Sequence, residues 1–251
     1  MSASELRDTF HAVLEGGAEK FIIWRLLPQE PSLRSYVEIF LDTPSFFVAY
    51  WNTVKITVGI LCLQLLVGAP IAWGFAQLSF PGKKVILAFY IILMILPFQI
   101  RMLSEYLLLQ KLNLLDSLWA VILPSGFSTF PIFIMYNFFK GIPREILEAA
   151  RVDGANEIQI FFRMGLSIGI IGMTSVVVIG FFEYWSILEQ PMLFLNNKTL
   201  WPLSLNIPNM RFENIHIIFT SAVLAMIPSV AIFVLGQEYL EKGITGAVIK
   251  R

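Results

Sequence analysis

Few residues of this sequence are of the types that carry out chemistry. Its two histidines, His11 and His216, lie far apart, and its single cysteine, Cys62, lies in an apolar run, where such a residue usually packs as a small hydrophobe. No metalloprotease motif, nucleophile elbow or Cys/His metal spacing occurs. Gly82-Lys83-Lys84 lacks both the upstream glycine and the following hydroxyl residue of a phosphate-binding loop. We therefore predict no catalytic residue, no metal, no cofactor and no ATP hydrolysis in this chain.

A polar stretch between two apolar runs, Gly141–Met164, has the clearest local structure signals. Pro143 suits the first position of a helix, and Arg144–Asp153 consists mostly of good helix formers. Gly154 can take the left-handed conformation that ends a helix, and Asn156 can cap a second short helix. The stretch is therefore predicted to form two short helices joined by a glycine turn, a knob that stands out of the apolar part of the protein.

The side chains of this knob favour contact with another surface. Ala149 and Ala150 are small enough to permit close approach. Without a partner, four larger apolar side chains would be partly exposed: Ile146, Leu147, Ile158 and Phe161. Arg151 and Arg163 are expected to face solvent or lipid phosphates. A loop that packs only on itself is the alternative.

Glu183 is the only acid well inside an apolar run. Because a charge in lipid is costly, its carboxylate is expected to line a translocation path, pair with a partner subunit or reach the outer surface. The neighbouring Tyr184 and Trp185, and also Trp201, could stack on a sugar ring, although aromatic residues at this depth often anchor a membrane interface.

The composition requires elements that lie in a membrane. Of 251 residues, 57% are hydrophobic and only 14% charged, and the mean hydropathy is +0.72. Soluble domains have about 25% charged residues. A soluble enzyme and a disordered scaffold are therefore poor fits, and the net charge of zero gives no indication of nucleic-acid binding. The sequence predicts an all-α, polytopic transmembrane bundle.

Stretches free of Asp, Glu, Lys and Arg give the expected spans, since a bilayer core needs about 20 apolar residues in a helix. There are five such stretches: Ile56–Gly82, Val85–Ile100, Ser117–Phe139, Met164–Phe182 and Asn214–Gln237. Pro97 is expected to break the second near Leu96, so that Arg101–Leu115 runs along the interface, with a continuous tilted helix as the alternative.

The distribution of Lys and Arg predicts the orientation. They are denser in the loops that would share the side of the knob: Lys83, Lys84, Lys140, Arg144, Arg151, Arg163, Lys242, Lys250 and Arg251. The positive-inside rule then places the C-terminus in the cytoplasm and the N-terminus outside. The expected organisation is an outer or interfacial segment 1–47, which includes an apolar patch at Phe21–Leu27, a transmembrane domain 48–238 with a cytoplasmic loop 141–165, and a cytoplasmic tail 239–251.

The knob resembles the E-A-A-x3-G signature of permeases from binding-protein-dependent ABC importers. Glu148-Ala149-Ala150 is followed after three residues by Gly154, and the family's later I-x-L-P is present only as Leu166, with Met164 and Ser167 at its first and last positions. Other segments are similar to the sugar-type branch, which includes the second permease of maltose and glycerol-phosphate systems: Pro31–Tyr36, Trp51–Thr53, Leu112–Ser117, Leu123-Pro124 and Tyr239–Val248. The chain departs from that branch in lacking a convincing sixth, N-terminal span, unless Phe10–Leu27 is its remnant. It also departs at Glu183–Ser186, where the branch has a Trp-Asn pair.

The resemblance implies a division of labour. A cytosolic ABC ATPase dimer would hydrolyse ATP and push on the coupling helix in the knob, and the chain would pair with a second permease subunit, most simply as a heterodimer. An extracytoplasmic solute-binding protein would deliver a sugar or related polar solute across the prokaryotic plasma membrane. The coupling residues would be Glu148, Ala149, Ala150, Arg151, Asp153 and Gly154, with Glu148 and Asp153 meeting basic residues of the ATPase.

Two other functions fit the same residues. The chain could carry a non-sugar solute such as a polyamine, or serve as a membrane scaffold that binds an ATPase and transports nothing. Polar side chains along a path would favour transport, and a bundle filled by Leu and Phe would favour the scaffold.

Overall fold

The computed structural model describes residues 36–37, 39, 44–210 and 215–248, and the side chains of these residues except 215–216 and 240–248. Several expectations therefore lie outside the described residues: the apolar patch 21–27, the remnant 10–27, His11, the side chain of His216 and the last residues of the tail. The described part is helical and contains no strand, which confirms the all-α fold.

The first span is longer than the charge-free stretch predicts. It comprises α3 (Pro44–Leu63), a π-helical turn η1 (Gln64–Gly68) and α4 (Ala69–Gln77), together 34 residues. The expected start at Ile56 is wrong because Lys55 does not end the helix; its side chain is exposed, so the charge stays at the surface. A π-helical turn such as η1 is often found at functional sites in helices.

The second charge-free stretch is broken where Pro97 predicts it. Helix α5 (Lys83–Ile95) ends just before Leu96, and α6 (Phe98–Lys111) leaves at an angle of 102°. Pro97 has no N–H to continue the ladder of α5, and it instead precedes the first residue of α6. The continuous tilted helix is therefore wrong.

The third and fourth spans are also segmented. The third consists of α7 (Trp119–Gly126) and α8 (Thr129–Lys140). The fourth bends by 66° at Gly169, between α11 (Leu166–Ile168) and α12 (Ile170–Trp185), whereas the sequence predicts one continuous segment. At the bend the chain packs closely on α8, and a Cβ at Gly169 would lie 2.3 Å from Cε1 of Phe139.

The remaining elements are one long helix and several short ones. Helix α15 (Ile215–Val248) contains the last apolar segment, and it continues beyond Gln237 into the expected tail. The short elements before it are α13 (Glu189–Phe194), η3 (Lys198–Leu200), α14 (Leu203–Asn206) and η4 (Ile207–Asn209). Within the described residues, three helices are long and apolar enough to cross a membrane, and five segments qualify when each bent pair is counted as one span.

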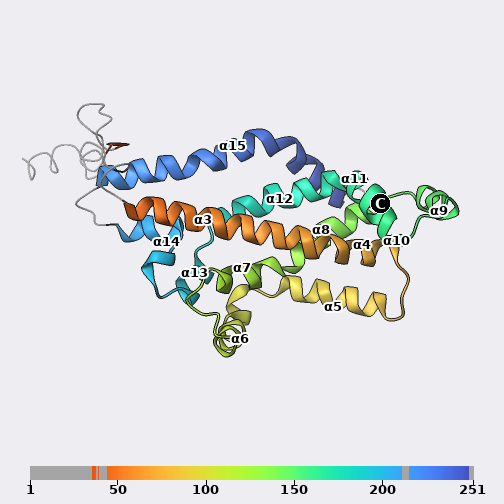
Figure 1. The fold of residues 1–251 in the computed structure, drawn as a ribbon, viewed down its shortest axis with the longest axis horizontal. Coiled ribbons are helices and arrows are strands. Elements are labelled where there is room, and N and C mark those ends of the chain that lie inside the picture. Colours follow the sequence, from red (N-terminus) through yellow and green to blue (C-terminus); the bar gives the residue numbers. More distant parts are fainter. Residues whose placement is uncertain (1–35, 38, 40–43, 211–214, 249–251) are drawn as a thin grey trace, which may run out of the picture.

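The largest core cluster joins the first, third and fourth spans near one end of the bundle. Trp73 of α4 lies against Phe139 of α8, with ring centroids 5.5 Å apart, and against Phe161, at 5.7 Å. In Figure 1 this end carries α9 (Arg144–Val152), α10 (Glu157–Ile160) and α11, while α6, α13 and α14 lie toward the other end. The core thus joins the neighbouring ends of three spans into one support for the segment that projects beyond them.

Candidate functional site

The predicted knob is present and projects from one end of the bundle (Figure 1). Helix α9 (Arg144–Val152) is attached through Leu147, which is 1% exposed and belongs to the core cluster with Trp73 and Phe139. Ala150 packs against the same cluster one turn later. Pro143 directly precedes the helix and so occupies the N-cap position rather than the expected first helical position.

The turn after α9 has the conformation that the glycine predicts. Gly154 has φ +85°, and its N–H and that of Ala155 donate to the carbonyls of Arg151 and Ala150, which closes the end of the helix. A Cβ at Gly154 would meet nothing within 4 Å, so the position favours glycine for its backbone conformation alone.

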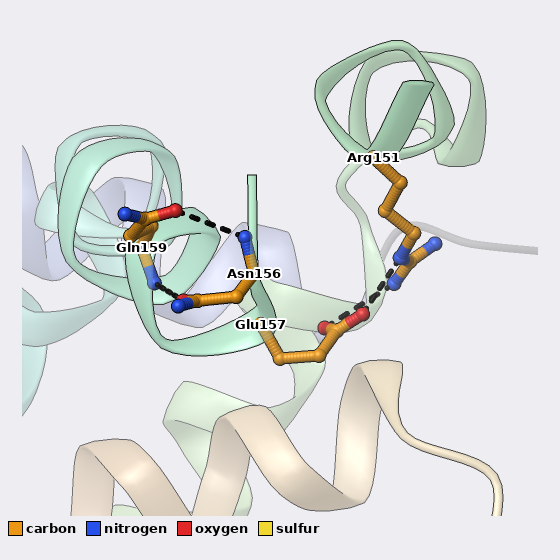
Figure 2. Close-up of polar contacts among 4 residues, drawn as sticks. All are labelled: Arg151, Asn156, Glu157 and Gln159. Carbon is orange, nitrogen blue, oxygen red and sulfur yellow. Dashed lines mark hydrogen bonds and ion pairs between the residues drawn. The ribbon is translucent and has the colours of Figure 1, made fainter. Parts of the chain in front are cut away.

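Helix α10 (Glu157–Ile160) begins with a complete capping box. Figure 2 shows Asn156 accepting from the backbone N–H of Gln159 at 2.8 Å, while the Gln159 side chain accepts from the N–H of Asn156 at 3.0 Å. Each bond satisfies a backbone donor that a helix start leaves free. The predicted capping role of Asn156 is confirmed.

An ion pair ties the two short helices together. The guanidinium of Arg151 donates to Glu157 at 2.7 Å, as Figure 2 shows. This hydrogen bond raises the pKa of Arg151 above its usual value. The sequence predicts that Arg151 faces solvent or lipid phosphates. Its side chain is partly exposed but is held by Glu157, the first residue of α10. With the glycine turn and the capping box, the pair makes the knob stiff.

The outward face of α9 combines an exposed valine at the end of the helix with acidic neighbours. Val152 is 87% exposed, and at helical spacing it shares a face with Ala149, Glu148 and Glu145, all exposed. Ile146 and Ile158 are exposed as predicted. The expectation is wrong for Leu147 and Phe161, because both insert into the core beneath the knob.

The second candidate group lies at the other end of α12, where the structure separates its members. Glu183 is exposed, whereas Tyr184 and Trp185 are buried. Trp185 stacks on Phe181 with centroids 5.1 Å apart and donates through Nε1 to the carbonyl of Ala225. Its ring faces are therefore engaged within the bundle in this structure.

A buried polar network that the sequence reading missed surrounds Tyr184. Gln64, at the first position of η1, donates through Nε2 to the Tyr184 hydroxyl at 2.7 Å and to the carbonyl of Ser125 at 2.9 Å. The Ser125 hydroxyl donates to Gln190 of α13 at 2.6 Å. Gln64 is 1% exposed, so the network joins three spans and α13 away from water. In the sequence, the signal that could have indicated this network is Gln64 itself, a polar residue inside an apolar run.

Side-chain bonds also fix the segment between α12 and α15 to the start of the first span. Asn52 donates to the carbonyls of Thr199 and Trp201, and the hydroxyl of Thr53 accepts from the N–H of Leu203 at 2.9 Å. Both residues belong to Trp51–Thr53, a segment that is similar to the sugar-type branch. In the fold their side chains bind the backbone of η3 and α14 and of Trp201 between them.

The comparison with protein families decides what the bundle and knob belong to. The model of the "binding-protein-dependent transport system inner membrane component" family matches residues 64–246. This chain belongs to that family. It is therefore the membrane component of a transport system and not an enzyme; the ATP hydrolysis of such systems takes place in separate subunits. The matched region contains η1, the knob and most of α15.

Individual relatives of this permease are transport proteins for sugars. The arabinooligosaccharides transport system permease protein AraQ of Halalkalibacterium halodurans is 26% identical over 226 residues, which cover 89% of this chain and 81% of AraQ. The polygalacturonan/rhamnogalacturonan transport system permease protein YtcP of Bacillus subtilis is 29% identical, covering 78% of this chain and 66% of YtcP. A solved bacterial ABC transporter involved in import of the acidic polysaccharide alginate has a chain with the same fold, with a TM-score of 0.74, 20% identity and coverage of 95% and 98%.

The buried network gives a testable expectation for stability. In the variant Gln64→Leu, the Tyr184 hydroxyl and the Ser125 carbonyl lose their donor, while the volume of the side chain at position 64 changes little. Interhelical hydrogen bonds in membrane proteins contribute about 0.6 kcal/mol on average, so two of them predict a loss of about 1 kcal/mol. Thermal unfolding in detergent measures this loss. If the bond between Gln64 and Tyr184 matters, the double variant with Tyr184→Phe should lose less than the sum of the two single variants.

Proposed function

We propose that this chain is the membrane-spanning subunit of an ATP-binding-cassette importer for a sugar, and that α9 is the surface on which a cytosolic ATPase subunit docks. One observation carries the proposal: α9 stands outside the bundle on a stiff support and presents Val152, 87% exposed, to the surroundings. An apolar side chain this exposed, at the last residue of a projecting helix, suits a partner surface that covers it.

The proposed transfer of force uses the support beneath the knob. An ATPase surface that moves α9 would act through Leu147 on the cluster of Trp73, Phe139 and Phe161, and hence on the first, third and fourth spans at once. Glu148 and Asp153 are exposed and lie close to Val152 in the chain, where they can meet basic residues of the ATPase. Arg151 acts within the knob, through Glu157.

The sugar substrate is inferred from the relatives, whose names specify arabinooligosaccharides and polygalacturonan or rhamnogalacturonan. The remaining parts of the proposal are a second permease subunit, most simply in a heterodimer, an extracytoplasmic solute-binding protein, and a prokaryotic plasma membrane. The end that carries α9 and the C-terminus is proposed to be cytoplasmic and the N-terminus outside. Glu183 is proposed to face the translocation path, because an exposed carboxylate at the end of a membrane helix needs water or a polar partner.

Purification of the tagged chain from its native membrane in mild detergent tests this assembly. We expect an ATPase, a second permease and MgATP hydrolysis in the same sample, and uptake of labelled arabinan or galacturonan oligosaccharides by cells that carry the genes of these partners. Recovery of the chain alone, or of an ATPase without any uptake of solute, would contradict the proposal and favour a scaffold.

The docking face itself is tested by the variant Val152→Asp. Full burial of a valine side chain stabilises a contact by about 1.5 kcal/mol or more, so we expect recovery of the ATPase with the tagged chain to fall about tenfold. Val152→Leu is the matched control and should retain the ATPase. Because Val152 touches little of the bundle, both variants should insert and unfold as the wild type does. Undiminished ATPase recovery with Val152→Asp would place docking elsewhere.

A further inference from the structure

The end of the bundle that carries α9 also holds a group of cations that the transport mechanism does not use. The start of α5 contributes Lys83 and Lys84, and the end of α8 with the start of α9 contributes Lys140 and Arg144. The amide of Gln77 donates to the carbonyl of Phe139 and holds the two segments together. The ammonium of Lys83 donates to the carbonyls of Ala76 and Leu78, which flank Gln77, so it lies at the end of α4 that Gln77 joins to the residue before Lys140.

This group lacks an acidic counterpart in the described part of the chain. The ion pairs found there join Arg101 to Glu105 and Arg151 to Glu157, and neither includes one of the four cations. Lys83 donates instead to the backbone carbonyl of Leu78 at 2.7 Å, and Lys140 lies over the ring of Tyr136. Like charges held close by the fold repel one another, and an anion between them would offset that repulsion.

The position of the group indicates what that anion is. Helix α5 has no buried residue, and its apolar side chains are open along its length, from Val85, 73% exposed, to Ile95, 72% exposed. Such a helix lies at the periphery with its face toward acyl chains. Lys83 and Lys84 form its first turn, and Phe80, in the turn before it, is also exposed. The cations therefore stand at the level of the headgroups next to a lipid-facing helix.

We propose that Lys83, Lys84, Lys140 and Arg144 form a binding site for the headgroup of an anionic phospholipid, with the acyl chains along α5. Lys84, Lys140 and Arg144 are exposed and supply the contacts to the phosphate. Lys83, whose ammonium also holds the carbonyl of Leu78, fixes the turn that brings the others together. The site would tie the segment leading into α9 to the membrane surface. It does not depend on which solute is transported.

Native mass spectrometry of the purified full chain, titrated with phosphatidylglycerol or phosphatidylcholine, tests the site. We expect the wild type to retain phosphatidylglycerol in preference. The variant Lys140→Gln/Arg144→Gln should bind it about tenfold more weakly, since each cation near a membrane surface contributes substantially to attraction of anionic lipid. The control Lys111→Gln/Lys198→Gln removes the same charge from exposed lysines elsewhere on the chain and should bind as the wild type does.

Three results would overturn the proposal. Equal phosphatidylglycerol binding by the site and control variants would show that the cations do not form a lipid site. Displacement of the lipid by inorganic phosphate at the same concentration would identify a small-anion site instead. Unchanged lipid binding together with loss of a co-purified ATPase would assign the cations to the ATPase surface. If the double variant does not fold, Lys84→Gln alone, at an exposed position, gives the same comparison with a smaller expected effect.

Discussion

The variant Gly154→Leu is expected to lower ATP-driven uptake by about tenfold while the protein still inserts in the membrane. Gly154 has φ +85°, a conformation that costs a residue with a Cβ about 1–2 kcal/mol. A Cβ there would meet nothing within 4 Å, so the effect comes from the backbone alone. Relief of that strain would change the angle between α9 and α10, and the outward face of α9 would no longer fit its partner. Uptake per molecule of membrane-inserted chain measures the loss.

Gly82 provides a matched control for this strain. It has φ +79° in the turn before α5, and a Cβ there also meets nothing within 4 Å. Gly82→Leu should therefore destabilise the chain as much as Gly154→Leu but should retain coupling to the ATPase. Gly154→Asn should keep most of the uptake, because asparagine tolerates the left-handed region better. Normal uptake by Gly154→Leu, or an equal loss in both leucine variants, would remove the role assigned to the geometry of the knob.

The variant Gly172→Leu is expected to cause the largest loss of stability. A Cβ at this position would lie 2.5 Å from Cγ and 2.7 Å from Cβ of Phe138, so it meets the root of that side chain and not a flexible tip. Helices α12 and α8 would have to separate. Overpacking of this kind costs about 1–3 kcal/mol in well-packed cores, and we expect a loss at the upper end or failure to accumulate folded protein. Thermal unfolding in detergent and the yield of monodisperse protein measure it.

Gly74 of α4 offers a control of the same chemical change. The nearest atom to a Cβ there is Leu78 Cδ1 at 3.9 Å, an ordinary contact. Gly74→Leu should therefore be neutral or slightly stabilising, since leucine favours a helix over glycine by about 0.8 kcal/mol. Equal melting temperatures for Gly172→Leu and the wild type would show that α8 and α12 do not pack as closely as described.

Local signals in the sequence were sufficient for those parts of the chain whose structure depends on neighbouring residues. Pro97 predicts the break between α5 and α6, Gly154 the left-handed turn and Asn156 the cap of α10, and each is present. These predictions succeed because a proline ring, a missing Cβ and a side-chain acceptor act within a few residues of where they stand.

Charge-free stretches were a weaker guide to helix bounds. The first helix starts at Pro44 and not at Ile56, since the long side chain of Lys55 remains exposed while its backbone is helical. The bend at Gly169 was not predicted; at this point the chain packs closely on the ring of Phe139, which is thirty positions away in the sequence. The order of residues along the chain does not show that Gly169 and Phe139 will be in contact.

The sequence by itself predicted an α-helical membrane protein with a knob of two short helices between its third and fourth spans, because apolar length and turn residues act locally. Its E-A-A-x3-G spacing indicated a permease by resemblance. The tertiary structure decided which knob residues are anchors and which face outward: Leu147 and Phe161 enter the core, while Val152 and Ile158 stay exposed. It also brought Gln64, Ser125 and Tyr184 into one buried network. The physical reason is that burial and hydrogen bonding between spans depend on how distant helices pack, and helical periodicity leaves that packing open.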